Sequence, residues 1–314
     1  MKLANYPCDL HTHTRRSDGN DTYQELIDHA AERGMKVIAI TDHDIVPLET
    51  VKTENGHSFP LKQYAKGKGL CVIPGIEFSC NTQVEDVHVI GLGCDFSDPL
   101  FAEQARDTAE SKVESYQELC RRLGDRSMPI SWEEVLSFNG SPIDESTVQK
   151  KLIFELMAAK GYAPDWSQAK LMVKHEPYFQ INRRKPDPEA MIHLIKKSGG
   201  IAILAHPYLI EEPVDHHGRG ISRREYIEIL IEAGLDGIEA SYPYEKTSYK
   251  GNLVSSEMER KIREIYGERL PILSGGSDYH NDAKKGVKNA REIGEKGVTY
   301  EYFMQNTLLK KLFD

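Results

Sequence analysis

The sequence predicts an α/β fold in which a parallel sheet, covered by helices, closes into a barrel. Short apolar runs alternate with amphipathic helical segments, and this alternation is typical of strand–helix units that build parallel sheets. The chain has 314 residues, enough for one large domain or for one domain with an insertion. The number of strand–helix units favours closure of the sheet into a barrel.

The first strand–helix unit follows the N-terminal motif. Thr22 and Glu25 fit a helix capping box, an apolar stripe comes next, and Gly34 stands where the helix would end. The apolar segment 36–40 then predicts a short buried strand. Segments 70–80 and 87–96 predict two further strands that neighbour each other.

The same order of helix, glycine, apolar strand and polar tip returns three times. The strand segments are "IAILAHP" (201–207), "IEASYP" (238–243) and "PILSGGSDYH" (271–280). Residues 99–187 instead show helical patterns and no convincing buried strand. We therefore expect a barrel domain formed by 1–98 and 188–314, with a helical insertion over 99–187 that caps the active site.

Composition excludes several classes of partner. Lys and Arg number 40 against 49 Asp and Glu, a net charge of −9. This balance argues against stable complexes with long nucleic acid or anionic membranes, but it allows a small phosphorylated ligand in a local positive site. No apolar run approaches the roughly 20 residues that span a bilayer, and the first residues lack a signal-peptide core. The five cysteines form no CxxC pair, which predicts reduced thiols in a cytoplasmic protein.

Histidine and acidic residues fall at the tips of the predicted strands. Alternate side chains of a strand share a face, so His11 and His13 can point at one centre. The C-terminal ends of parallel barrel strands open on one face, so residues at those tips should meet. The candidates are His11, His13, Asp18, His43, Glu77, His88, His206, Asp278 and His280.

These nine nitrogen and oxygen donors indicate more than one metal ion. They exceed the needs of a single tetrahedral zinc and include no thiolate. A carboxylate such as Glu77 can bridge two ions, and imidazole–carboxylate shells suit Mn²⁺, Fe²⁺ or Zn²⁺. Each motif alone has an ordinary structural explanation, such as a packed histidine pair. Their joint occurrence at strand tips favours a hydrolytic metal site.

The motifs together resemble the PHP (polymerase and histidinol phosphatase) family. The matching segments are "DLHTHTRRSDG" (9–19), "AITDHD" (39–44), "GIEFS" (75–79), "VHVIGLG" (87–93), "GGIAILAHP" (199–207) and "SGGSDYH" (274–280). Their spacing and the helical insertion are most similar to the small-molecule phosphoesterases of the family, which include nucleotide and nucleoside-bisphosphate phosphatases. The resemblance implies a distorted (β/α)7 TIM-like barrel with three divalent metal ions.

The resemblance also implies a role for each candidate ligand. The first metal would be held by His11, His13, Glu77 and Asp278; the second by Glu77, His88 and His206; the third by Asp18, His43 and His280. Asp278, Glu77 and His206 are the expected catalytic residues, and a hydroxide that the metals activate would attack phosphorus.

Basic residues outside the metal motifs are candidates for substrate binding. In this subgroup an Arg-x-His pair near the start of a helix in the insertion often binds substrate phosphate. Here Lys150 stands about where the arginine would be, and lysine offers a point charge instead of a bidentate fork. Arg183 and Arg184, and Arg16 inside the first motif, are further candidates, with a solvated surface role as the alternative.

The leading hypothesis is a metal-dependent phosphoric ester hydrolase that acts on a small phosphorylated metabolite, a nucleotide or a related ester. Alternatives are a phosphodiesterase or 3′→5′ exonuclease on short oligonucleotides or cyclic phosphates, and a histidinol-phosphate-type phosphatase. A classical amidohydrolase commonly uses a bridging carboxylated lysine, but segment 70–80 offers Glu77 and no lysine. A non-catalytic metal-binding module is the remaining alternative.

Overall fold

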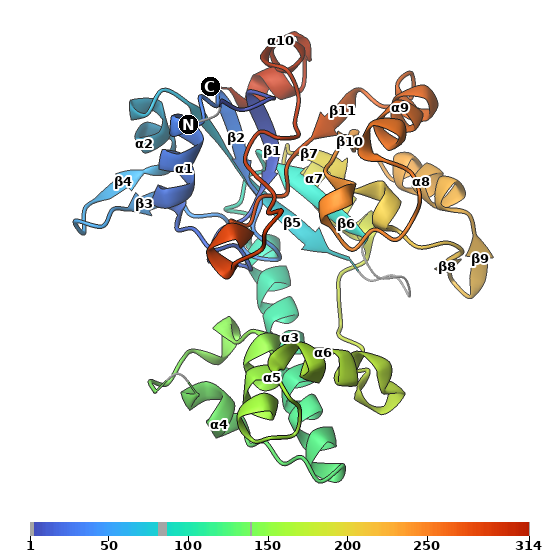
Figure 1. Cartoon of the computed structure of the whole chain (residues 1–314). Coiled ribbons are helices and arrows are strands. Elements are labelled where there is room, and N and C mark those ends of the chain that lie inside the picture. Colours follow the sequence, from blue (N-terminus) through green and yellow to red (C-terminus); the bar gives the residue numbers. More distant parts are fainter. Residues whose placement is uncertain (1–2, 81–86, 139, 314) are drawn as a thin grey trace. The chain divides into compact units, whose positions relative to one another are not determined.

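A seven-stranded sheet forms the centre of the larger part of the molecule. We describe a computed structural model over residues 3–80, 87–138 and 140–313 (Figure 1). The chain splits into two units, Met1–Gln104 with Pro186–Asp314 and Ala105–Lys185, which are described separately. The sheet order is β1 (Cys8–Thr12), β2 (Val37–Ile40), β5 (Cys71–Ser79), β6 (His88–Leu92), β7 (Ile201–Leu204), β10 (Gly237–Ser241) and β11 (Ile272–Gly275).

The sheet is mixed, so the prediction of an all-parallel sheet is wrong at one strand. β6 runs antiparallel to both β5 and β7, whereas the other neighbouring strands pair in parallel. Only eight residues separate Ser79 from His88. A parallel connection needs a crossover of about a dozen residues or more, so a short connection favours the antiparallel arrangement.

The two outer strands of the sheet approach each other and nearly close the barrel. Thr12 forms a parallel bridge with Tyr279, and the backbone N–H of His13 donates to the carbonyl oxygen of Tyr279 at 2.9 Å. A Cβ at Gly276 would lie 2.3 Å from Cβ of His11, so glycine permits this close approach. The predicted distorted barrel is confirmed.

Helices cover the outside of the sheet. They are α1 (Tyr23–Glu32), α2 (Leu61–Gly67), α7 (Pro188–Lys197), α8 (Arg223–Glu232), α9 (Ser255–Tyr266) and α10 (Tyr300–Gln305). α2 packs on β5, α7 on β6 and β7, and α9 on β10 (Figure 1). The predicted capping box forms at α1, where Thr22 and Glu25 satisfy each other's backbone N–H groups. These helices bury apolar faces, and strands β1, β2, β7 and β10 are buried along their whole length, as in sheets that helices cover.

Shorter elements join the main ones. Two hairpins lie outside the sheet: β3 (Thr50–Lys52) with β4 (Ser58–Pro60), and β8 (Val214–His216) with β9 (Arg219–Ile221). Short 3₁₀ helices are η3 (Pro207–Leu209), η4 (Tyr244–Lys246), η5 (Asp282–Lys285) and η6 (Leu309–Leu312). The buried ends of β1, β2 and β7 share a core with Phe303 of α10.

The second unit has its own apolar core. Its elements are α3 (Pro99–Asp125, which begins in the larger unit), α4 (Trp132–Ser137), η1 (Glu145–Thr147), α5 (Lys150–Ala159), α6 (Trp166–His175) and η2 (Pro177–Phe179). Leu119 and Leu123 of α3 are buried with Ile153 and Met157 of α5. Among the described residues of this unit none lies in a strand. That this unit caps the site stays a proposal.

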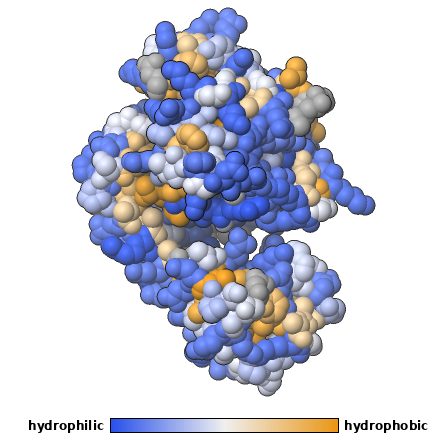
Figure 2. All heavy atoms as spheres, turned by 90° about the vertical axis from the view of Figure 1, so that its left-hand side faces the viewer, coloured by the Kyte–Doolittle hydropathy of each residue, from blue (hydrophilic) through white to orange (hydrophobic). Residues whose placement is uncertain are grey.

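The face of the molecule drawn in Figure 2 carries mostly hydrophilic residues, with apolar residues interspersed among them. Isolated exposed apolar side chains, such as Leu3 and Val287, are ordinary on a folded protein. Within the described part of the chain, no helix combines the length and the apolar character that crossing a bilayer requires.

Candidate metal centre

The nine predicted ligands come together at one end of the sheet. His11 lies in β1, Glu77 in β5 and His88 in β6, whereas the others follow strand ends or occupy adjoining loops. His88 is the first residue of β6. Because β6 is antiparallel, its N-terminal end lies at the rim where the parallel strands have their C-terminal ends. The prediction placed His88 at the correct rim on the wrong assumption of a parallel strand.

In the cluster expected to hold the first metal, the Nε2 atoms of His11 and His13 both lie near one oxygen of Glu77 and one oxygen of Asp278. Nε2 of His11 lies 3.1 Å from Nε2 of His13 and 3.0 Å from Oε2 of Glu77. Nε2 of His13 lies 3.1 Å from the same Glu77 oxygen. Oδ1 of Asp278 is 3.2 Å from His13 Nε2 and 3.5 Å from His11 Nε2. Four donors about 2.0–2.1 Å from an ion would be about 3.3 Å apart in a tetrahedron, so these spacings fit a divalent metal.

The two oxygens of Glu77 face different groups of histidines. Oε2 faces His11 and His13, and Nδ1 of His43 lies 3.3 Å away. Oε1 lies 2.9 Å from Nδ1 of His88 and 3.1 Å from Nε2 of His206. A carboxylate so placed can bridge two ions.

A further cluster gathers at the open side of the site. Nε2 of His280 lies 2.9 Å from Oδ1 of Asp18, and Nδ1 of His13 lies 3.8 Å from the same oxygen. The ring of His13 stacks between those of His43 and His280, at centroid separations of 4.6 and 4.3 Å. These four side chains offer donor atoms within 4.8 Å of one another.

Burial makes the charges of this site strongly interdependent. Burial alone would lower the pKa of His13, but its hydrogen bonds to Asp278 and Glu77 raise that pKa to about 10. Glu77 resists protonation: burial opposes its charge, yet the surrounding histidines hold its pKa well below the usual range. His88 differs, because burial outweighs Glu77 and lowers its pKa to about 4. Buried carboxylates packed among imidazoles need cations, and divalent metals supply them.

Two of the candidate ligands have unusual backbone conformations. His206 has φ of 27° and Asp278 has φ of 51°. Positive φ is uncommon for residues other than glycine, and such strain is found preferentially at functional sites. The backbone N–H of His206 donates to Oε2 of Glu239 at 2.8 Å, which helps to hold this conformation.

A family model described as the PHP domain matches residues 9–163. Residues 9–163 of this chain therefore carry a PHP domain. The match includes four of the motif segments quoted above, and the predicted resemblance is confirmed.

Curated relatives cover most of the chain. A phosphoribosyl 1,2-cyclic phosphate 1,2-diphosphodiesterase from Eggerthella lenta is 26% identical over 279 residues, or 87% of this chain and 93% of the relative. A 3′,5′-nucleoside bisphosphate phosphatase from Chromobacterium violaceum is 25% identical over 293 residues, or 91% and 90%. The 5′-3′ exoribonuclease Rnm of Salmonella typhimurium is 28% identical over 226 residues, or 67% and 72%.

A solved structure shares the fold of this PHP protein. The Bifidobacterium adolescentis chain, assigned to the metal-dependent phosphoesterases, aligns with a TM-score of 0.70 at 22% identity and covers 98% of both chains. At this identity the likeness establishes the architecture, including the barrel.

The PHP site also contains residues that sequence reasoning missed. Oε1 of Glu239 lies 3.2 Å from Nδ1 of His11 and fixes the ring that faces the first cluster. Asp9, fully buried, accepts from the backbone N–H groups of Ser277 and Gly294, and burial raises its pKa to about 6. Asp9 lies two residues before His11 in β1, and Glu239 lies in the middle of β10. The strand alternation that paired His11 with His13 could therefore have found Asp9.

Asp42 organises the loop of the first motif. Its carboxylate accepts from the backbone N–H and the hydroxyl of Thr14 at 2.7 Å and from Ser17 Oγ at 2.7 Å. Arg291 also belongs to this site: its guanidinium contacts Asp278, and Nη2 lies 3.0 Å from Nδ1 of His280. It stands in a loop without periodicity, which left no sequence signal.

The predicted substrate-binding residues divide between the two units. Arg16 is half-buried beside the metal motif, and Nη1 donates to the carbonyl oxygen of Val46 at 2.6 Å. Lys150, Arg183 and Arg184 belong to the second unit. Arg184 pairs there with Glu114 on an exposed surface, at 2.6 Å.

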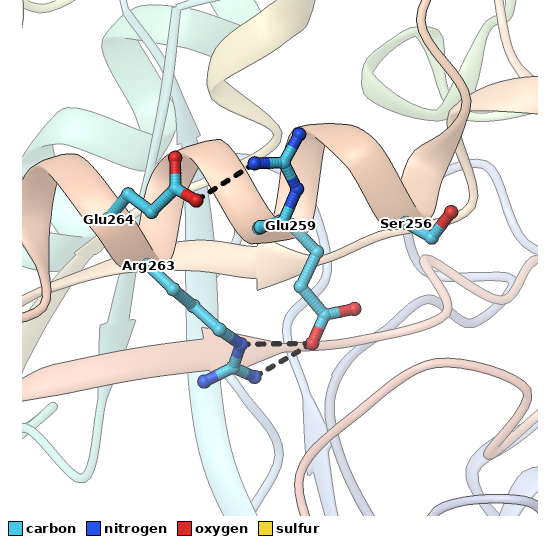
Figure 3. Close-up of a pocket in the computed structure, with 5 residues that line it drawn as sticks. Ser256, Glu259, Arg263 and Glu264 are labelled. Carbon is cyan, nitrogen blue, oxygen red and sulfur yellow. Dashed lines mark hydrogen bonds and ion pairs between the residues drawn. The ribbon is translucent and has the colours of Figure 1, made fainter.

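A shallow surface pocket on α9 is lined by none of the nine predicted ligands. It is lined by Ser256, Glu259, Arg260, Arg263 and Glu264. The charged side chains of this helix pair with each other one turn apart (Figure 3). Such exposed pairs contribute little energy and leave no charge for a ligand, so this pocket is a poor candidate for a functional site.

Proposed function

We propose that this PHP protein is a metal-dependent phosphoesterase that hydrolyses a small phosphorylated metabolite, a nucleotide or a related ester. The observation that carries the proposal is the cluster of His11, His13, Glu77 and Asp278, in which the two histidine Nε2 atoms lie 3.0 to 3.5 Å from each other and from one oxygen of each carboxylate. Such spacings suit ligands of one ion.

Three divalent ions would occupy the site. His11, His13, Glu77 and Asp278 would hold the first; Glu77, His88 and His206 the second; Asp18, His43 and His280 the third. Mn²⁺, Fe²⁺ and Zn²⁺ all suit these imidazole and carboxylate donors. When bound, divalent ions supply Lewis acidity toward phosphoryl oxygens and lower the pKa of water.

The protein's own residues would define where the ester sits. One carboxylate oxygen of Glu77 faces His11 and His13, and the other faces His88 and His206. Glu77 would therefore set the spacing of the two ions that it bridges. The side chain of Asp18 is 51% exposed and that of His43 24% exposed, whereas those of His11 and Glu77 are buried. Phosphate would therefore enter beside Asp18 and His43. The proposed contacts for the rest of the substrate are Arg16, which lies inside the first motif, and Lys150, Arg183 and Arg184.

The relatives support the substrate class. Two of them are named for small phosphorylated molecules, a cyclic phosphate diester and a nucleoside bisphosphate. Two donor groups sharing Glu77 suit either a mono- or a diester, because both present phosphoryl oxygens to neighbouring cations. The acidic net charge of −9 is consistent with a small substrate and not with long nucleic acid.

Cleavage of short RNA is the second candidate. The relative named Rnm is a 5′-3′ exoribonuclease, and the same site would accept a terminal phosphodiester. The named direction differs from the 3′→5′ alternative proposed from the sequence, so labelled oligonucleotides should be tested from both ends.

Phosphate release tests the proposal. The Mn²⁺-loaded protein should be screened against mono-, di- and bisphosphate esters, alongside Asp278→Asn and the matched control Asp95→Asn. Asp95 is an exposed carboxylate beyond the far end of β6 that accepts from Ser97. We expect turnover by the parent protein and by Asp95→Asn, and none by Asp278→Asn. Equal turnover by all three would reject the proposed site.

A further inference from the structure

Arg291 places a cation against two of the proposed ligands. It stands in the loop that follows η5, and its side chain is 15% exposed. Nη1 donates to Oδ2 of Asp278. Nη2 lies 3.0 Å from Nδ1 of His280 and 3.3 Å from Oδ2 of Asp282. All of these contacts are to side chains of residues 278–282, in the segment that follows β11.

The two oxygens of Asp278 have separate environments. Oδ1 faces the first cluster, 3.2 Å from Nε2 of His13 and 3.5 Å from Nε2 of His11. Oδ2 accepts from Arg291 and also from the hydroxyl of Tyr242 at 2.7 Å. Tyr242 is itself buried. Two donors therefore occupy the outer oxygen and leave the inner one for the metal.

The position of Arg291 is set by contacts of the residues beside it. Nζ of Lys246 donates to the carbonyl oxygen of Ala290 at 2.9 Å. The backbone N–H of Gly294 donates to Oδ2 of buried Asp9 at 2.9 Å. The chain is thus tied down on both sides of Arg291, and the guanidinium is held against Asp278 by the fold.

We propose that Arg291 is a positioning residue that, with Tyr242, makes Asp278 a one-oxygen ligand of the first metal. This inference rests on the proposed function of the site. A carboxylate can bind a cation through one or both oxygens. If Oδ2 were free, it could turn toward the ion and occupy the position that a substrate oxygen needs. Two donors on Oδ2, Nη1 of Arg291 and the hydroxyl of Tyr242, prevent this by fixing the orientation of the carboxylate.

Mn²⁺ binding to the metal-stripped protein tests the proposal directly. Equilibrium dialysis should compare the parent with Arg291→Gln, Arg291→Lys and the control Arg260→Gln, which removes an exposed pair with Glu264 on α9. Loss of a residue that orients a ligand costs roughly 10–100-fold in metal affinity or activity. We expect that loss of Mn²⁺ affinity in Arg291→Gln and a smaller loss in Arg291→Lys, which keeps the charge without the fork. Arg260→Gln should match the parent.

Mn²⁺ binding by Arg291→Gln that equals or exceeds that of the parent would overturn the inference. Where circular dichroism shows that Arg291→Gln does not fold, Tyr242→Phe decides. It removes one neutral donor to the same oxygen, and about fivefold weaker binding is expected for one net hydrogen bond; unchanged binding would reject the proposal.

Phosphate release, measured in parallel, separates this inference from the proposed function. A parent protein that binds Mn²⁺ but hydrolyses no ester would overturn the function and leave the positioning role to the binding data. A parent that binds no Mn²⁺ would overturn both.

Discussion

The two ends of the ligand cluster differ in how much water reaches them. The side chains of His11 and Glu77 are 0% and 1% exposed, whereas that of Asp18 is 51% exposed and that of His43 24%. The buried end is surrounded by partners that fix each donor, such as Glu239 beside His11. Asp18 lies in a loop and faces His280 from the open side.

This difference indicates a division of labour. Donors that are already desolvated and oriented lose little freedom when an ion binds, so the buried end should bind metal tightly. The open end should exchange its ion more readily and should be the side at which substrate arrives. The predictions below test this contrast.

The largest effect is expected at the carboxylate shared by two proposed ions. Glu77→Gln replaces the carboxylate by a neutral amide, so the protein should bind both ions more weakly. Activity should fall by more than about 100-fold, beyond the range for residues that only orient ligands. Metal content by elemental analysis should drop by more than one ion per chain. A loss of one ion or fewer would contradict the bridging role.

A change at the open end should cost less. Asp18→Asn should remove about one ion per chain and leave the buried ions bound, because none of the contacts among His11, Glu77 and Asp278 involves Asp18. Its control is Asp95→Asn. When the metal-loaded parent protein is dialysed against a weak chelator, one ion, that of the open end, should leave before the others. Simultaneous loss of all ions would contradict the expected difference in metal affinity between the two ends.

The folding stability of the metal-free protein should depend on pH because His13 titrates. Its folded pKa of about 10 lies above the ordinary value of 6.5. The protonated form therefore stabilises the folded state fully below pH 6.5, and this contribution is lost as the pH rises toward 10. We expect the melting temperature without metal to fall over that window, while Mn²⁺ affinity rises because metal competes with protons. His13→Gln should flatten both trends.

The smallest effect is expected at an exposed ion pair of the second unit. Arg184 and Glu114 form an exposed pair, with side chains 66% and 58% exposed. Such exposed pairs contribute little to the stability of a fold. Arg184→Gln should leave the free energy of unfolding nearly unchanged in chemical denaturation, and it should leave Mn²⁺ binding unchanged. A raised KM with unchanged kcat would instead show that Arg184 contacts substrate.

Strand periodicity explains how much of this site the sequence could predict. His11 and His13 share a face because β1 alternates, and the remaining candidates follow strands that end at one rim. The direction of β6 was not predictable from apolar pattern, since a buried strand looks the same in either direction. Only the short connection from Ser79 to His88 indicated it.

Contacts between distant segments could not be predicted in the same way. Arg291 reaches Asp278 because Lys246 and Asp9 hold the chain on either side of it. No local pattern marks such a residue, since its role comes from three segments meeting in the fold. Asp9, by contrast, lies two residues before His11 in β1, so strand alternation could have found it.

Metal content tests the central claim most directly. The protein should be loaded with Mn²⁺, freed of excess metal and analysed for bound metal per chain, in parallel with Asp18→Asn. The account predicts about three ions in the parent and about two in the variant. One ion or fewer in the parent would contradict it.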